Sequence, residues 1–212
     1  MDKWSPQDAM NAYLHTLHLC QSNEYGNTTS IEPKCMEFIS ALAAGKRAKI
    51  MVEITTEGIT PLTIALAVAA KHTGGKLICI ISPHQQNFKT TSSQNLHNLQ
   101  HLQDVIEFVH GNPLQLVKEL KKVDLLVIDG RLEDQIKLIK VVDFNENGCD
   151  IVGHNMHYRR NCLISFGEVL SGKKGVEYKT MAIGDGIELT RIGCMSKVTR
   201  RYRRFHVTFE NY

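Results

Sequence analysis

Short apolar runs alternate with amphipathic stretches along most of the chain, and this alternation predicts the fold class. The runs are largely apolar, which is typical of buried strands. They cover residues 48–54, 77–81, 105–109, 123–128 and 149–153. Strands and helices that alternate in this way indicate parallel strands with right-handed crossovers. We therefore expect an α/β fold with a doubly wound, mostly parallel sheet.

Helical spacing and end signals mark the segments between the strands. Ser5-Pro6 is typical of a helix start, and Gly45 and Gly74 are typical of helix ends. Beyond a first helix after Pro6, the expected helices cover residues 33–44, 61–71, 95–102, 113–120 and 132–142. Near the C-terminus, two apolar stretches at 178–183 and 187–192 are joined through Gly184-Asp185-Gly186. This pattern predicts an antiparallel hairpin.

Length and composition fit one ordinary domain. The chain has 212 residues, of which 42% are hydrophobic and 22% charged. We expect residues 1–47 to form a helical N-terminal cover and residues 48–212 to form the sheet core with the hairpin and a basic tail. The start of the chain lacks a secretory pattern, and the most apolar run, 59–70, is too short to cross a bilayer. These features indicate a cytoplasmic protein, with a nuclear location left open, and no membrane partner.

The six cysteines contain no C-x-x-C pair, so neither a zinc ribbon nor a thioredoxin motif is predicted. Cys79 and Cys149 lie inside apolar runs and are expected to pack as small hydrophobic side chains. A reducing compartment is consistent with this usage.

Short motifs in the predicted order resemble cation-dependent, caffeoyl-CoA-type O-methyltransferases. They are Phe-Ile-Ser-Ala-Leu-Ala at 38–43, Val-Glu-Ile at 52–54, Val-Ile-Asp at 127–129 and Ile-Gly-Asp-Gly-Ile at 183–187. The whole chain resembles a plant family of unknown function that is classed with S-adenosylmethionine-dependent methyltransferases. Members of that family also open with Trp-Ser-Pro and carry Ala-Tyr-Leu, as here at 4–6 and 12–14. The resemblance implies a Rossmann-like class I methyltransferase fold, S-adenosylmethionine as cofactor and a small-molecule hydroxyl as methyl acceptor.

The expected cofactor loop, Glu53–Thr60, departs from the pattern of the resembled enzymes. Glu53 matches their acidic residue at the end of the first strand, but Thr55 and Ile59 stand where they have glycines. Gly58 is one position out of register. Glycine lets the backbone approach a ligand and turn with positive φ, and a β-branched Thr55 resists both. A cofactor would have to be bound along another path.

The residues expected to hold the nucleoside are also altered. A ribose is normally held by an acid at the end of the second strand, yet no Asp or Glu occurs between Glu57 and Asp104. Ser82, His84 and Gln85 remain there as weaker partners. Asn112 replaces the acid that meets adenine in the resembled enzymes, and an amide can still bond an adenine edge. The candidate cofactor-binding residues are Glu53, Thr55, Gly58, Ser82, His84, Asn112 and Asp129.

The resemblance implies a divalent metal site that is only half kept. Asp129 matches one metal ligand of the resembled enzymes and Asn155 matches another, but His154 replaces a carboxylate. This replacement weakens the binding of Mg²⁺ or Ca²⁺ and favours a transition metal. His157 is close enough in sequence to add a ligand. The lysine base of those enzymes is replaced by Leu132. Arg131 stays protonated and cannot act as a base.

Each of these residues also has a purely structural interpretation. Asp129 could cap the following helix, and 154–157 could be a polar loop. Glu53 in a buried strand needs a polar partner, which could be a backbone N–H of its own loop. The polar stretch Gln85–Gln103 is either a loose surface helix or a lid over the pocket.

A basic cluster near the C-terminus leaves a further alternative open. Residues 197–204 contain Lys197 and several arginines, which suit phosphate contacts or nuclear import. The favoured interpretation is an edge strand whose charges protect it from aggregation, because the net charge of the chain is only +3. We expect a small-molecule ligand in preference to nucleic acid, and a homodimer remains open. Two functional hypotheses follow: a methyltransferase-like protein with a degraded cofactor loop, or a catalytically inactive binding or scaffold protein.

Overall fold

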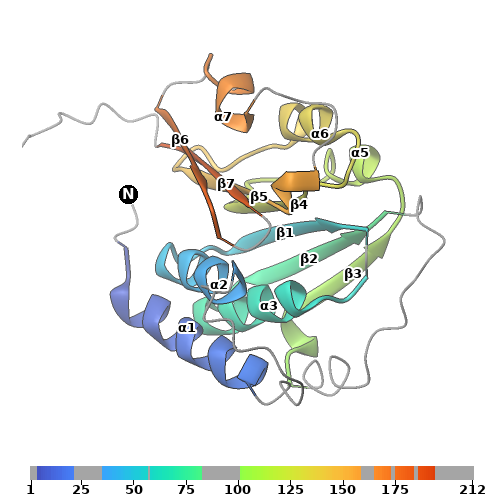
Figure 1. Ribbon diagram of the computed structural model, residues 1–212. Helices are drawn as coiled ribbons and strands as arrows, with labels where there is room; N and C mark the ends of the chain where they lie inside the picture. The colour runs from blue at the N-terminus through green and yellow to red at the C-terminus, as the bar shows by residue number, and fades with distance from the viewer. Residues whose placement is uncertain are drawn as a thin grey trace, which may run out of the picture.

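The computed structural model describes residues 4–21, 35–56, 58–82, 101–158, 165–172, 175–183 and 186–193. Within these residues a twisted sheet carries helices on both faces (Figure 1). No helix of this part of the chain is long and apolar enough to cross a membrane.

The sheet has seven strands in the order β3-β2-β1-β4-β5-β7-β6. Strands β1 to β5 pair in parallel, whereas β7 is antiparallel to both β5 and β6. The strands are β1 (Ile50–Thr55), β2 (Lys76–Ile81), β3 (Ile106–His110), β4 (Leu125–Asp129), β5 (Cys149–His154), β6 (Val176–Met181) and β7 (Ile187–Ile192). The predicted mostly parallel sheet and the C-terminal hairpin are confirmed.

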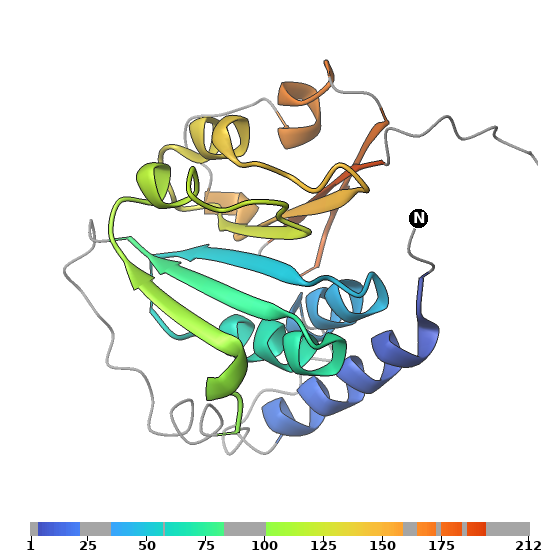
Figure 2. The ribbon, with the colours of Figure 1, turned by 180° about the vertical axis from the view of Figure 1, so that it is seen from behind.

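The helices form two layers, one on each face of the sheet. One layer contains α1 (Pro6–Gln21), α2 (Cys35–Gly45) and α3 (Pro61–Thr73), and the other contains α5 (Pro113–Leu116), α6 (Gln135–Val141) and α7 (Phe166–Val169), as Figure 2 shows from behind. Two single-turn 3₁₀ helices, η1 (Gln103–Val105) and η2 (Met156–Tyr158), complete the described elements.

Two apolar cores explain why the central strands are mostly hydrophobic on both faces. In β4, Leu125 and Val127 pack with the layer of α1, α2 and α3, while Leu126 and Ile128 pack with the opposite layer. Successive side chains of a strand point to opposite faces, so a strand covered on both faces loses its polar positions. Cys79 and Cys149 are fully buried, as expected.

The predicted helix ends are largely confirmed by capping contacts. Ser5 Oγ accepts a hydrogen bond from the backbone N–H of Asp8 at 3.3 Å, and Pro6 begins α1. Thr60 and Thr63 form a reciprocal capping box at the start of α3, and Gly74 ends that helix in the left-handed conformation. These are local contacts, which is why the sequence pattern indicates them.

Two predicted helices are too long. The helix expected at 113–120 ends at Leu116, because the following N–H groups of Lys118 and Glu119 bond three residues back and tighten the chain into turns. The helix expected at 132–142 begins only at Gln135. Of the helix predicted at 95–102, only 101–102 lie within the described residues, and they form a turn.

Close backbone contact before β2 leads to the first prediction. A Cβ atom on Gly75 would lie 2.6 Å from the carbonyl oxygen of Ala48 and 2.8 Å from that of Lys49. We expect Gly75→Ala to lower the free energy of unfolding by about 2 kcal/mol, measured by urea denaturation, because backbone must shift to admit the methyl group.

Gly172→Ala is the matched control, since nothing lies within 4 Å of the added Cβ. It should change stability by less than about 0.5 kcal/mol. Equal stability of the two variants would contradict the close packing at Gly75.

Candidate functional site

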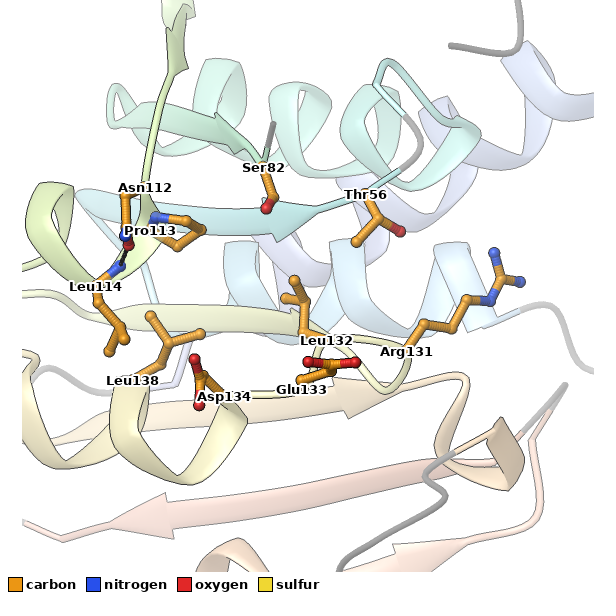
Figure 3. A pocket seen from close by; sticks show the side chains of 10 residues that line it. All are labelled: Thr56, Ser82, Asn112, Pro113, Leu114, Arg131, Leu132, Glu133, Asp134 and Leu138. Carbon is orange, nitrogen blue, oxygen red and sulfur yellow. Dashed lines mark hydrogen bonds between the residues drawn. The ribbon is translucent and has the colours of Figure 1, made fainter. Parts of the chain in front are cut away.

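A pocket of about 390 Å³ lies at the carboxyl ends of β1, β2, β3 and β4 (Figure 3). The order of the strands reverses between β1 and β4, and ligands of doubly wound sheets bind at this switch point. The volume falls at the lower end of the range for small-molecule sites, about 300–1,000 Å³. The lining residues are Thr56, Ser82, Asn112, Pro113, Leu114, Arg131, Leu132, Glu133, Asp134 and Leu138.

Two of the candidate nucleoside-binding residues line this pocket. Ser82 directly follows β2, and its backbone N–H is fixed by the carbonyl oxygen of Thr55 at 3.1 Å. Asn112 follows β3 and also caps α5, because its Oδ1 atom accepts the backbone N–H of Leu114 at 2.9 Å. This bond leaves the amide nitrogen of Asn112 and the second lone pair of its Oδ1 atom for a ligand. His84 lies outside the described residues.

The candidate residues Glu53, Thr55 and Gly58 of the cofactor loop are absent from the lining of the pocket. Thr55 is the last residue of β1, pairs with Ile81 and is buried, so it extends the strand and does not form the turn. Gly58 takes the positive φ of the loop, at 78°. Ile59 packs against the core with α1, α2 and α3. The loop thus meets the pocket through Thr56.

Glu53 points into a small buried polar cluster next to α3. Only 1% of the residue is exposed, and burial raises the pKa of its carboxyl to about 7, with the nearby charge of Asp129 adding to the rise. Hydrogen bonding from Thr63, Cys79 and Thr60 opposes this shift. Within the described residues, the expected polar partners of Glu53 are therefore the side chains of Thr63, Cys79 and Thr60. Burial also raises the pKa of the Cys79 thiol, which keeps it protonated.

Asp129 joins the ends of three strands. Its Oδ2 atom accepts the hydroxyl of Thr56 at 3.3 Å, and its Oδ1 atom accepts the backbone N–H of Arg131 at 3.0 Å and the amide of Asn155 at 3.2 Å. Only 1% of Asp129 is exposed. The interpretation of Asp129 as the cap of the following helix is wrong, because α6 begins after Asp134.

The predicted metal ligands do not fit a divalent ion in the described part of the chain. Asn155 directs its amide nitrogen at Asp129, so the two groups bond each other and do not turn two oxygens toward one point. His154 is the β5 neighbour of Asp129, and His157 is exposed and packs beside Gly186. No group of three or more His, Cys, Asp or Glu side chains in this part of the chain could hold a metal.

The loop between β4 and α6 supplies two pocket residues, Glu133 and Asp134, that the sequence did not single out. Glu133 and Asp134 line the pocket from exposed positions, and Leu132 projects toward its centre (Figure 3). A signal was available, since these residues closely follow a strand end at the switch point. The sequence pattern instead placed these residues in the helix expected at 132–142, which begins only at Gln135.

The family of the chain follows from comparison with known sequences. Residues 2–208 match the family model described as "Protein of unknown function (DUF1442)". The chain belongs to the DUF1442 family. No curated protein matches this DUF1442 chain in sequence at a significant level.

Solved structures show that this DUF1442 chain has the Rossmann-like fold of class I methyltransferases. A methyltransferase from Geobacter sulfurreducens has a TM-score of 0.58 and 17% identity, covering 85% of this chain and 88% of that one. An O-methyltransferase from Bacillus cereus, crystallised with S-adenosylhomocysteine, has a TM-score of 0.57 and 17% identity, covering 85% and 90%. A candidate caffeoyl-CoA O-methyltransferase from Staphylococcus aureus has a TM-score of 0.56 and 16% identity, covering 85% and 92%. The predicted fold is confirmed.

The pKa of Glu53 makes stability depend on pH. The carboxyl has a pKa of about 7 when folded and 4.5 ordinarily, so the folded state binds its proton more tightly. This stabilisation is complete below pH 4.5 and is lost as the pH rises to 7. The loss should reach about 3 kcal/mol, because one pKa unit corresponds to about 1.4 kcal/mol.

Glu53→Gln removes this titration while it keeps the shape of the side chain. Relative to the unchanged protein, the variant should gain stability between pH 4.5 and pH 8, measured by urea denaturation across that range. Glu107→Gln, on the exposed face of β3, is the control and should leave the pH profile unchanged. Parallel profiles for Glu53→Gln and the unchanged protein would refute the raised pKa.

Proposed function

We propose that this DUF1442 chain is a methyltransferase-like protein that binds S-adenosylmethionine, or a related nucleoside, in the pocket at the switch point. The position of the pocket carries the proposal, because Thr56, Ser82 and Asn112 come from the ends of three neighbouring strands and converge there. The Bacillus cereus O-methyltransferase, whose structure contains S-adenosylhomocysteine, has the same fold.

The lining of the pocket suits the parts of a nucleoside. Pro113, Leu114 and Leu138 provide apolar surface for a flat adenine ring, and the amide nitrogen of Asn112 can meet an adenine edge. Ser82 comes from the end of β2, where doubly wound folds hold a ribose. The remaining end of the ligand would extend toward Thr56 and the start of α3.

The reaction that this site would support is methyl transfer to a small-molecule hydroxyl. Such a transfer needs a group that takes the proton of the hydroxyl as the new bond forms. Leu132 lies in the pocket where the resembled enzymes have a lysine base, and it cannot take a proton. This observation favours a second candidate function, in which the chain binds the nucleoside as a catalytically inactive binding or scaffold protein.

A divalent metal is not part of the proposed binding. The bond between Asp129 and Asn155 occupies the two groups that would hold it. Binding should therefore be the same with and without Mg²⁺, Mn²⁺ or Zn²⁺, and a requirement for any of them would refute this part of the proposal.

Calorimetric titration of the full chain with S-adenosylmethionine and S-adenosylhomocysteine tests the binding. We expect a dissociation constant of about 1 mM or tighter for either ligand. Ser82→Phe should weaken binding at least about tenfold, because the ring would occupy the pocket and a loss of 1.4 kcal/mol corresponds to that factor. Absence of binding at millimolar ligand in every metal condition would overturn the proposal.

Ser171→Phe is the matched control, since Ser171 is exposed and does not line the pocket. It should bind as the unchanged protein does.

To separate the two candidate functions, S-adenosylhomocysteine release is measured with a panel of hydroxylated small molecules. Release above the background without acceptor supports the enzyme, and binding without release supports the inactive binding protein.

A further inference from the structure

Several polar side chains of the pocket already have partners. Asn112 Oδ1 accepts the N–H of Leu114, and Thr56 Oγ1 donates to Asp129. Asp134 forms an ion pair with Lys137 at 2.7 Å. A ligand that bonded any of these groups would have to compete with a contact inside the protein.

Glu133 differs from these groups. Its carboxylate lines the pocket, and within the described residues it makes no hydrogen bond or ion pair. Glu133 and Ser82 lie on opposite walls of the pocket, one on the loop after β4 and the other at the end of β2 (Figure 3). The pocket therefore offers one uncommitted carboxylate across from a hydroxyl.

The loop that carries Glu133 is fixed before any ligand binds. The amide nitrogen of the buried Gln135 donates to the carbonyl oxygens of Gly130 at 2.6 Å and Leu132 at 2.8 Å. The N–H of Arg131 bonds Asp129, and a Cβ atom on Gly130 would collide with the backbone of 154–155. A binding group presented on a fixed backbone loses less entropy when it orders around a ligand.

We infer that Glu133 supplies the carboxylate that binds the ribose diol, in place of the acid missing at the end of β2. The inference rests on the proposed nucleoside binding. An ionised carboxylate is an acceptor with two oxygens, so it can accept hydrogen bonds from two neighbouring hydroxyls. Such charge-assisted bonds are about twice as strong as neutral ones. Ser82 complements Glu133 from the opposite wall of the pocket.

Titration of Glu133→Gln with S-adenosylhomocysteine and its 2′-deoxy analogue tests this role. The unchanged protein should bind S-adenosylhomocysteine about tenfold more tightly than the 2′-deoxy analogue, as expected for one hydrogen bond to a charged group. Glu133→Gln should weaken the binding of S-adenosylhomocysteine by about tenfold. It should also largely abolish the difference in affinity between S-adenosylhomocysteine and its 2′-deoxy analogue.

Glu119→Gln is the matched control, because Glu119 is an exposed carboxylate that does not line the pocket and the substitution makes the same change of charge. It should change either affinity by less than about twofold, since salt screens an exposed charge that lies away from the ligand. Thermal melting of the three proteins without ligand shows that each is folded.

The outcomes separate this inference from the proposed function. Failure of the unchanged protein to bind either ligand would refute nucleoside binding itself. Normal binding by the unchanged protein, with Glu133→Gln indistinguishable from it, would refute the role of Glu133 alone. A larger loss for S-adenosylmethionine than for S-adenosylhomocysteine, with the 2′-deoxy preference intact, would show that Glu133 recognises positive charge and would overturn the diol assignment.

Discussion

The buried carboxylate of Asp129 holds the site together. Its three donors come from the residue after β1, the loop after β4 and the residue after β5, so one side chain fixes the relative positions of three strand ends. A carboxylate without exposure is costly unless it is hydrogen bonded, and each donor reduces that cost. The walls of the pocket that follow β1 and β4 therefore depend on the same group.

Asp129 also affects Glu53 through its charge. Burial is the main reason for the raised pKa of Glu53, and the neighbouring charge of Asp129 adds to it. Two neighbouring buried carboxyl groups cannot both ionise at low cost. Because Glu53 is enclosed by Thr63 and Cys79 and absent from the pocket lining, its proton concerns the stability of the sheet more directly than ligand recognition.

The sheet could be predicted from the sequence, whereas the site could be predicted only in part. Continuous apolar runs such as that of β4 specify strands buried on both faces, and caps such as Thr60 are local signals. The start of α6 could not be read in this way, because the loop before it is held by Gln135 through bonds to backbone carbonyls that leave no residue pattern. Glu133 was missed for that reason.

For the candidate site residues, the sequence likewise predicts position at a strand end but not the contacts that each side chain makes. Ser82 and Asn112 line the pocket because a residue that follows a parallel strand comes to the edge where ligands bind. The capping role of Asn112 depends on the short α5 that follows it. The metal expectation at Asp129, His154 and Asn155 came from the resemblance to cation-dependent enzymes, which does not specify side-chain orientation, and orientation decides such a site.

The contacts of Gln135 separate the path of the β4–α6 loop from the identity of its side chains. These bonds use backbone carbonyls, so the loop can keep its course while exposed neighbours such as Glu133 are exchanged. Ligand preference can then diverge among proteins of this architecture without any penalty to the sheet. Similarity in the strands would then reflect common ancestry. Differences in the side chains of this one loop would reflect differences in the ligand that each related protein binds.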